Sequence, residues 1–259
     1  MPLLVCDIAG TTIDEGGVVY RQLRESVEKQ GITVTPDQVN QVKGTEKRSA
    51  INTLLSSGGF TPSEETINTA YNDFLEGLQT EYTNNPPTPI PGVEKLLREF
   101  QRKGGKVALT TGFQRSIAEI VLSAAGWGAR ALSIPPDETT VSSRLIDEAD
   151  NAPFSVDALV TSDTVRAGRP APYLIHHAME LTGVTNVAEV ISAGDTTADL
   201  DAATNAGVRG VGVLTGSLSR DVLEARPHTI VLDSLADLGS SESLSALNAA
   251  GEAVTELDG

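Results

Sequence analysis

The chain has 259 residues, of which 39% are hydrophobic, and its 19 Lys and Arg are outnumbered by 35 Asp and Glu, which gives a formal charge of −16 at neutral pH. Polyanion binding depends on clustered Lys and Arg, so this balance excludes roles on nucleic acids and on anionic membrane surfaces. No stretch has the roughly 20 apolar residues that cross a bilayer, and the N-terminus lacks a signal-peptide pattern, so we expect a cytoplasmic protein.

Short apolar runs with β-strand composition recur along the chain, most of them separated by stretches of helical length. The runs are Leu3–Cys6, Val107–Leu109, Ala158–Val160, Val190–Ala193 and Val208–Leu214. Alternating strands and helices predict βαβ units and therefore an α/β fold with a doubly wound, Rossmann-like parallel sheet. Ligands of such sheets bind at the carboxyl ends of the strands, so the residues after each run are the candidates for a site.

The segment between the first two runs departs from this alternation. From about Glu15 to Pro89 the pattern is helical, with capping boxes at Thr35-Pro-Asp-Gln38 and Thr61-Pro-Ser-Glu64. After Ser240 the composition turns to Ser, Ala, Gly and acids, which is typical of a flexible tail. The predicted division is an α/β core of residues 1–15 and 88–239, an inserted helical cap of residues 16–87, and a flexible tail of residues 240–259.

The two connections between the predicted cap and core differ in composition. Gly16 and Gly17 lie on one side, and the proline-rich segment 84–91 lies on the other. A flexible glycine pair on one connection and a stiff proline-rich segment on the other suit a hinged lid. A fixed helical subdomain is the alternative. The cap is also our candidate surface for a homodimer.

The first run ends in Asp7-Ile-Ala-Gly-Thr11-Thr12. A carboxylate directly after a buried strand, followed by Gly and hydroxyl residues, can bind a metal ion and cradle a phosphate-like anion, with Thr11 as a candidate contact. The second run ends in Thr110-Thr111-Gly112, before a helix expected near Gln114. A hydroxyl and an amide at a helix N-terminus also form an anion site. An ordinary turn and a helix cap are the alternatives.

Two later motifs complete the pattern. Arg169 lies in Arg-Ala-Gly-Arg-Pro-Ala-Pro172, and its planar fork suits bidentate contact with a phosphate. The fourth run ends in Gly194-Asp-Thr-Thr-Ala-Asp199, where Asp195 and Asp199 can share a hard cation, or one can ligate while the other orients its neighbours. Together the four strand ends supply a nucleophile, a phosphate clamp and a magnesium pair, which are the parts that phosphoryl transfer requires.

These four motifs resemble those of the haloacid dehalogenase superfamily, over residues from about 3 to 214, and the insertion lies where that superfamily places a helical cap. The resemblance implies a Mg2+-dependent hydrolase in which Asp7 is the nucleophile and a metal ligand. It further implies that the Ala9 carbonyl and Asp195 complete the protein ligands and that Asp199 supports the metal site. The residues implied to hold the phosphoryl group are Thr111, Gly112 and Arg169.

Ala9 points to one branch of this superfamily, because most of its phosphatases carry there an aspartate that acts as general acid and base, and a methyl group cannot move protons. The phosphonatases share this alanine, and a cap lysine three residues after a glycine forms an imine with their aldehyde substrate. Gly44 and Lys47 reproduce that spacing. Lys43 and Arg48 beside it would lower the pKa of Lys47 and attract the substrate, whereas a solvated basic turn is the alternative.

The sequence also departs from that branch, which has Met, His, Tyr and Cys where this chain has Lys43, Ala50, Phe113 and Gly17. The function predicted first is cleavage of the P–C bond of a small 2-oxo phosphonate of the phosphonoacetaldehyde type, through an aspartyl-phosphate and an imine on Lys47. The first alternative is a phosphatase for a small organic phosphate, with the cap lysines only binding substrate. The second is a non-catalytic protein that binds a phosphorylated metabolite.

Overall fold

The computed structural model describes residues 2–42, 47–59, 61–134, 143–147 and 149–240. Lys43 and Gly44 of the predicted cap site lie outside the described residues, as does the predicted tail from residue 241 onward. No helix within these ranges is long and apolar enough to span a membrane.

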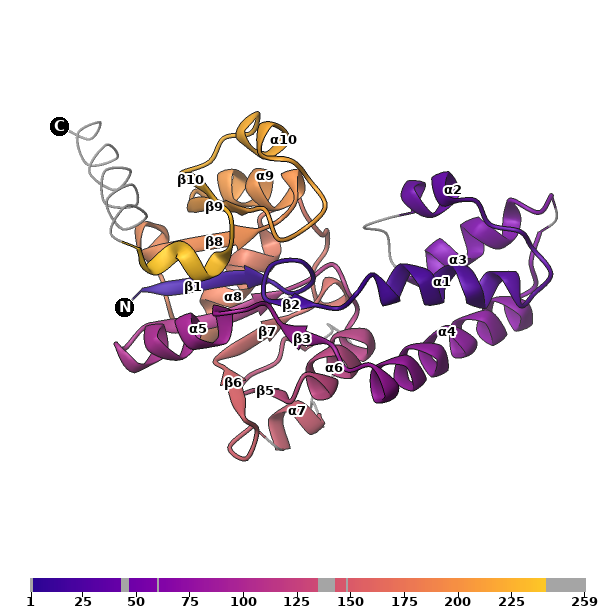
Figure 1. Cartoon of the computed structure of the whole chain (residues 1–259), viewed down its shortest axis with the longest axis horizontal. Helices are drawn as coiled ribbons and strands as arrows, with labels where there is room; N and C mark the ends of the chain where they lie inside the picture. Colours follow the sequence, from indigo (N-terminus) through magenta and orange to yellow (C-terminus); the bar gives the residue numbers. More distant parts are fainter. Residues whose placement is uncertain (1, 43–46, 60, 135–142, 148, 241–259) are drawn as a thin grey trace.

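The centre of the molecule is a six-stranded parallel sheet in the order β10-β9-β8-β1-β4-β7 (Figure 1). All five predicted runs are strands of this sheet. A sixth strand, which the sequence pattern did not single out, forms one edge. The strands are β1 (Leu3–Asp7), β4 (Lys106–Thr110), β7 (Ala158–Val160), β8 (Val190–Gly194), β9 (Arg209–Val213) and β10 (Ile230–Leu232).

Helices cover both faces of the sheet because alternate residues of each strand point to opposite sides. Leu4 and Cys6 of β1 belong to the apolar cluster that includes α5 (Val93–Arg102), α6 (Arg115–Ala124) and the 3-10 helix η3 (Leu235–Gly239). Leu3 and Val5 pack instead with α8 (Tyr173–Thr182) and α9 (Thr197–Ala206). The α/β, doubly wound arrangement is thereby confirmed. The remaining core elements are β5 (Trp127–Ala129), α7 (Arg144–Asp147), β6 (Phe154–Val156), η1 (Ser162–Thr164), η2 (Val187–Glu189) and α10 (Arg220–Glu224).

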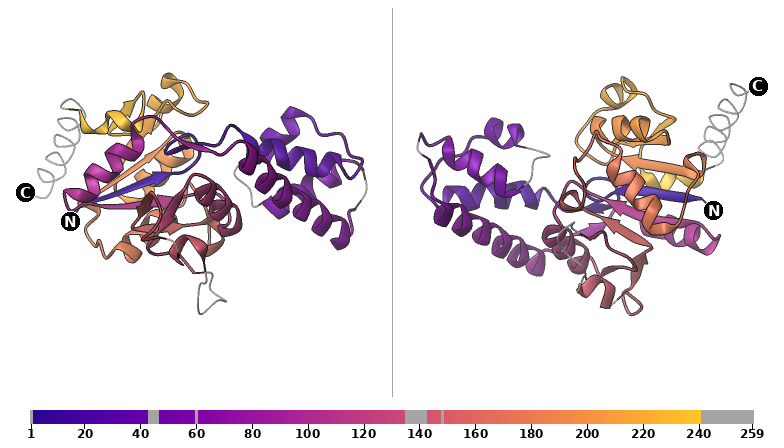
Figure 2. Two further views of the ribbon diagram at one scale, coloured as in Figure 1. Left: turned by 60° about the horizontal axis from the view of Figure 1, so that its bottom comes forward. Right: turned by 180° about the vertical axis from the view of Figure 1, so that it is seen from behind.

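The inserted segment is helical and lies beyond the carboxyl end of β1, to one side of the sheet (Figures 1 and 2). Within it, α1 packs against both α3 and α4. The chain enters and leaves through β2 and β3, a two-residue antiparallel pair that was too short to predict from its sequence. The elements are β2 (Ile13–Asp14), α1 (Val18–Glu28), α2 (Pro36–Gln41), α3 (Lys47–Ser56), α4 (Glu64–Asn84) and β3 (Thr88–Pro89).

One of the two predicted capping boxes is confirmed and the other is wrong. The Thr35 N–H donates to Gln38 Oε1 at 2.8 Å, and the Gln38 N–H donates to Thr35 Oγ1 at 3.3 Å. Ahead of α4, however, the N-cap is Ser63, whose hydroxyl oxygen accepts from the Thr66 N–H at 3.1 Å. Ser63 has the extended backbone of an N-cap and its side chain reaches the third helical amide, so α4 begins two residues later than the Thr61 box predicted.

Candidate active site

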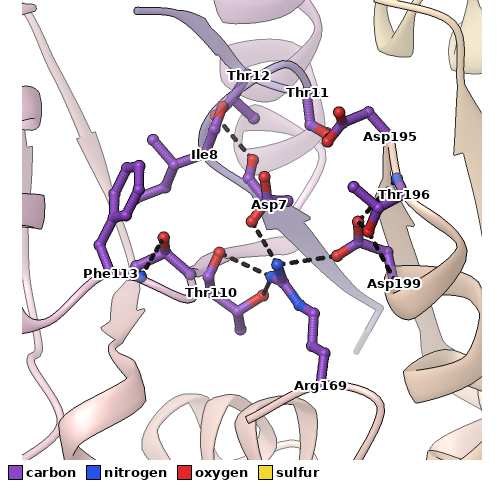
Figure 3. A network of polar contacts seen from close by, with 11 residues as sticks. Asp7, Ile8, Thr11, Thr12, Thr110, Phe113, Arg169, Asp195, Thr196 and Asp199 are labelled. Atoms are coloured by element: carbon purple, nitrogen blue, oxygen red, sulfur yellow. Dashed lines mark hydrogen bonds and ion pairs between the residues drawn. The ribbon is translucent and has the colours of Figure 1, made fainter. Parts of the chain in front are cut away.

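Five predicted site residues meet at the carboxyl ends of the central strands (Figure 3), namely Asp7, Thr11, Arg169, Asp195 and Asp199. Asp7 is the last residue of β1 and lies beside Thr110, the last residue of β4. On the other side of β1, Cys6 pairs with Ala193 of β8, which places Asp195 just beyond the same edge. The parallel register therefore brings together motifs that are far apart in the sequence.

Arg169 is the centre of the polar network. Its Nη1 donates to Asp7 Oδ1 at 2.5 Å and forms an ion pair with Asp199 Oδ1 at 2.9 Å, while Nη2 donates to Thr110 Oγ1 at 2.7 Å and to the Thr110 carbonyl at 3.0 Å (Figure 3). The three charged side chains are nearly buried. Charge-assisted bonds of this kind fix orientation, so Arg169 holds the Asp7 carboxylate in place at the strand end.

Asp199 caps a helix and also orients Arg169. Its Oδ2 accepts from the Thr196 N–H at 3.0 Å and from the Thr196 hydroxyl, which closes a capping box at the start of α9. Its Oδ1 faces Arg169. With both oxygens engaged, Asp199 supports the site through Arg169, and this arrangement favours the orienting alternative over direct cation binding.

Asp195 lies under the loop that follows β1. Thr11 Oγ1 donates to Asp195 Oδ1 at 3.3 Å, and a Cβ at Gly10 would come within 2.8 Å of Asp195 Oδ2. Gly10 also has a φ of +82°, so a side chain there would be strained as well as crowded. The Thr11 hydroxyl is fully buried and turned to Asp195, so it is not directed outward as its predicted phosphate contact requires.

A second loop, which the sequence reasoning missed, completes this arrangement. After β9, the Thr215 hydroxyl donates to the Gly10 carbonyl at 2.5 Å, and Gly216 is packed against Asp195 so tightly that a Cβ would overlap it. The sequence could have pointed to this loop, because Thr215 and Gly216 directly follow the fifth predicted run, at the carboxyl end of its strand. We infer that this loop holds the Asp7 loop and Asp195 together.

Buried negative charge exceeds positive charge here. Burial raises the pKa of Asp7 to about 6 although Arg169 lowers it, and burial together with Asp7 and Asp199 raises the pKa of Asp195 to about 8. Burial would lower the pKa of Arg169, but Asp199 and Asp7 raise it above its ordinary value. A carboxylate whose charged form is disfavoured in this way is stabilised by a nearby cation.

The donor set fits a hard divalent cation. Within the described ranges, no three His, Cys, Asp or Glu side chains form a metal-ligating group. The implied ligands need only two carboxylates, those of Asp7 and Asp195, with the Ala9 carbonyl as the third protein ligand. Oxygen donors and an excess of buried negative charge suit Mg2+, which keeps several waters in such sites.

The stability of the metal-free protein is expected to fall as pH rises from 6 to 8.5. Asp7 and Asp195 keep protons in the folded state at pH values where the unfolded chain, with its ordinary pKa of 3.8, has lost them. Their contribution to stability is therefore complete below pH 3.8 and is lost as pH rises through about 6 and about 8. Thermal unfolding in chelator should show a lower midpoint at the higher pH, and Mg2+ should raise the midpoint more there.

Asp195→Asn tests the assignment, because the amide cannot titrate and most of the pH-dependent difference should disappear. Asp150→Asn is the matched control, since the Asp150 side chain is 88% exposed. An undiminished Mg2+ response in Asp195→Asn would contradict the assignment.

The loop after β4 keeps Thr111 and Gly112 as candidate anion contacts, whereas the predicted helix N-terminus is occupied. Thr111 Oγ1 accepts from the Phe113 N–H at 3.0 Å, which leaves its hydroxyl hydrogen to donate elsewhere. In the described part of the chain, apart from the two neighbours of Gly112, no atom lies within 4 Å of the position that a Cβ on Gly112 would take. The expected helix N-terminus is different, because the Arg115 N–H of α6 donates to Asp163 Oδ1 at 3.2 Å. The carboxylate of Asp163 caps this helix, so within this loop Thr111 and Gly112 remain the candidate anion contacts.

The cap brings Lys47 to this loop. Lys47 is only 1% exposed, and its Nζ lies 5.8 Å from the centre of the Phe113 ring, two residues after Thr111. The Arg48 side chain points to α4 and not to the Thr111 loop. It donates to Asn68 Oδ1 at 2.6 Å and to Glu64 Oε2 at 2.7 Å. These bonds direct the Arg48 guanidinium to α4, which argues against its predicted role as a substrate contact.

Fold and site together define a Rossmann-like α/β hydrolase core with an inserted helical segment beyond the carboxyl end of β1. A family model described as haloacid dehalogenase-like hydrolase matches residues 1–207, and the chain belongs to this family. Phosphonoacetaldehyde hydrolase from Bacillus cereus (strain AH187) is 30% identical over 239 residues, which cover 88% of this chain and 81% of that protein.

Solved structures share the fold. A phosphonoacetaldehyde hydrolase-like protein from Oleispira antarctica superposes with a TM-score of 0.70 at 21% identity, over 97% of this chain and 94% of that one. CbbY from Rhodobacter sphaeroides in complex with phosphate gives a TM-score of 0.72 at 19% identity, over 95% of this chain and all of the other (100%). The similarity extends over cap and core alike.

Proposed function

We propose that the protein is a Mg2+-dependent hydrolase that cleaves the P–C bond of a small 2-oxo phosphonate of the phosphonoacetaldehyde type. The main support for the proposal is that Lys47 is buried and its amine lies near the Phe113 ring. Phe113 belongs to the Thr111 loop, at the carboxyl end of the sheet where Asp7 lies. The name of the relative at 30% identity supports the same substrate class.

The proposed reaction begins on the cap. The neutral Lys47 amine adds to the aldehyde carbon, one proton is taken up from solvent, water leaves, and a protonated imine forms. A carboxylate oxygen of Asp7 then attacks phosphorus, the P–C bond breaks, and its electron pair moves to carbon to give an enamine. Protonation of the enamine at carbon and addition of water release acetaldehyde and restore the amine. A second water hydrolyses the aspartyl-phosphate to inorganic phosphate.

The core residues act on the phosphoryl group during P–C cleavage. Arg169 holds Asp7 and presents positive charge beside the phosphoryl group, and Thr111 and Gly112 donate to its oxygens. When bound by Asp7, Asp195 and the Ala9 carbonyl, Mg2+ supplies further positive charge for those oxygens. Ala9 is tolerated because an enamine leaves without a proton, whereas an alkoxide leaving group needs a general acid.

The alternative with one specific observation in its favour is hydrolysis of a phosphate ester. The Lys47 Nζ also lies 4.9 Å from the centre of the Tyr20 ring, and two aromatic faces favour a charged ammonium group. An ammonium can bind an anionic substrate but cannot form an imine, so the protonation state of Lys47 separates the two functions.

Trapping with borohydride tests the proposal. The protein is incubated with Mg2+ and phosphonoacetaldehyde, reduced, and analysed by intact mass and peptide mapping, while phosphate release is followed in parallel. We expect an adduct on Lys47 and phosphate release from the phosphonate. Phosphate release from small phosphate esters without any adduct would support the alternative, and binding without turnover of any compound would refute both.

A further inference from the structure

Tyr20 is a residue that no motif singled out, and it lies against the proposed imine-forming lysine. It belongs to α1, is partly buried, and packs on the main apolar cluster. The Lys47 Nζ lies 4.9 Å from the centre of its ring and 5.8 Å from the centre of the Phe113 ring. Two cap helices and one core loop therefore meet at a single nitrogen atom.

The distances fall within the range in which a ring face attracts a cation, about 6 Å from the ring centre. Lys47 is 1% exposed, so water competes little with this attraction, which is strongest for desolvated pairs. Tyr20 and Lys47 lie on α1 and α3, which pack together within the cap, whereas Phe113 is supplied by the core. Among the described residues, the Tyr20 ring is thus a contact that the cap itself supplies to this nitrogen.

The nitrogen is cationic at the step where the P–C bond breaks. A protonated imine accepts the electron pair of that bond and becomes a neutral enamine, whereas a neutral imine would have to take on negative charge. A ring face stabilises the protonated imine but not the neutral one. Any group that favours the protonated form therefore raises the fraction of adduct that is competent for cleavage.

We propose that Tyr20 is a further catalytic residue, whose ring face contacts the Lys47 nitrogen and stabilises the protonated imine before P–C cleavage. The inference rests on the proposed function. The ring carries the effect and the hydroxyl does not, so phenylalanine can replace Tyr20 and leucine cannot.

The test compares Tyr20→Phe and Tyr20→Leu with Tyr173→Leu, a control at a tyrosine that is 46% exposed on α8. With phosphonoacetaldehyde and Mg2+, Tyr20→Phe should keep kcat within about twofold, and Tyr20→Leu should lose about fivefold to thirtyfold, the range of a desolvated cation–π contact. Tyr173→Leu should match the unaltered protein.

Borohydride separates catalysis from positioning, because reduction before cleavage leaves a phosphonoethyl group on Lys47 and reduction after cleavage leaves an ethyl group. In Tyr20→Leu the phosphonoethyl form should accumulate relative to the ethyl form. A lower total adduct with an unchanged ratio would show a merely structural role and overturn the inference, as would equal losses in Tyr20→Phe and Tyr20→Leu. Absence of any Lys47 adduct in the unaltered protein would instead refute the proposed function, and the inference with it.

Discussion

Replacing Asp7 by asparagine is expected to lower phosphate release from any substrate by about 10⁴-fold or more, as removal of a covalent nucleophile does elsewhere. The amide has the shape of the carboxylate but is a far weaker nucleophile toward phosphorus. Its oxygen can still accept from Arg169 Nη1, which lies 2.5 Å from Asp7 Oδ1, so the fold should persist. Steady-state phosphate release measures the loss, and acid-quenched intact mass shows whether the aspartyl-phosphate forms.

Asp163→Asn is the matched control for Asp7→Asn. Asp163 lies in a neighbouring strand-end loop and caps α6 through the Arg115 N–H, and asparagine caps helices about as well as aspartate. Its turnover should stay close to that of the unaltered protein. An Asp7→Asn protein that kept a tenth of the activity would contradict the role of Asp7 as nucleophile, because loss of a nucleophile costs orders of magnitude.

Lys47→Arg is expected to abolish the borohydride-trapped adduct and to lower P–C cleavage by about 10³-fold or more, because the step loses its covalent catalyst. A guanidinium group is always protonated in proteins and cannot form an imine. The substitution places a permanent positive charge where Lys47 faces Tyr20 and Phe113, so it removes the imine chemistry and can still attract an anionic substrate. Phosphate release and intact mass are measured as for the unaltered protein.

The control for this variant is Lys29→Arg, at a cap lysine whose side chain is 58% exposed. It should leave adduct formation and turnover unchanged. If Lys47→Arg raised only the KM and kept kcat, Lys47 would be a substrate-binding charge, and the phosphate-ester alternative would take the place of P–C cleavage.

Local sequence was a reliable guide to the core because the relevant signals are local. A buried strand followed by Asp7 or by Asp195 is visible as an apolar run with a polar end, and the rule that parallel strands end at one edge places both at one site. The Thr61 capping box was wrong because Thr61 and Ser63 are equally good N-caps by local sequence. The structure shows that Ser63 has the extended backbone of the N-cap.

The sequence by itself determined the class of fold and five of the six strands of the sheet, and it predicted Asp7 and Asp195 as site residues, since these inferences depend on periodicity and on which residue follows each strand. Only the tertiary structure decided which partners the charged groups contact. It turned Arg48 toward Glu64, gave the α6 N-terminus to Asp163, and placed Tyr20 beside Lys47. These outcomes depend on which helix faces pack together across long sequence separations, and no local pattern records that choice.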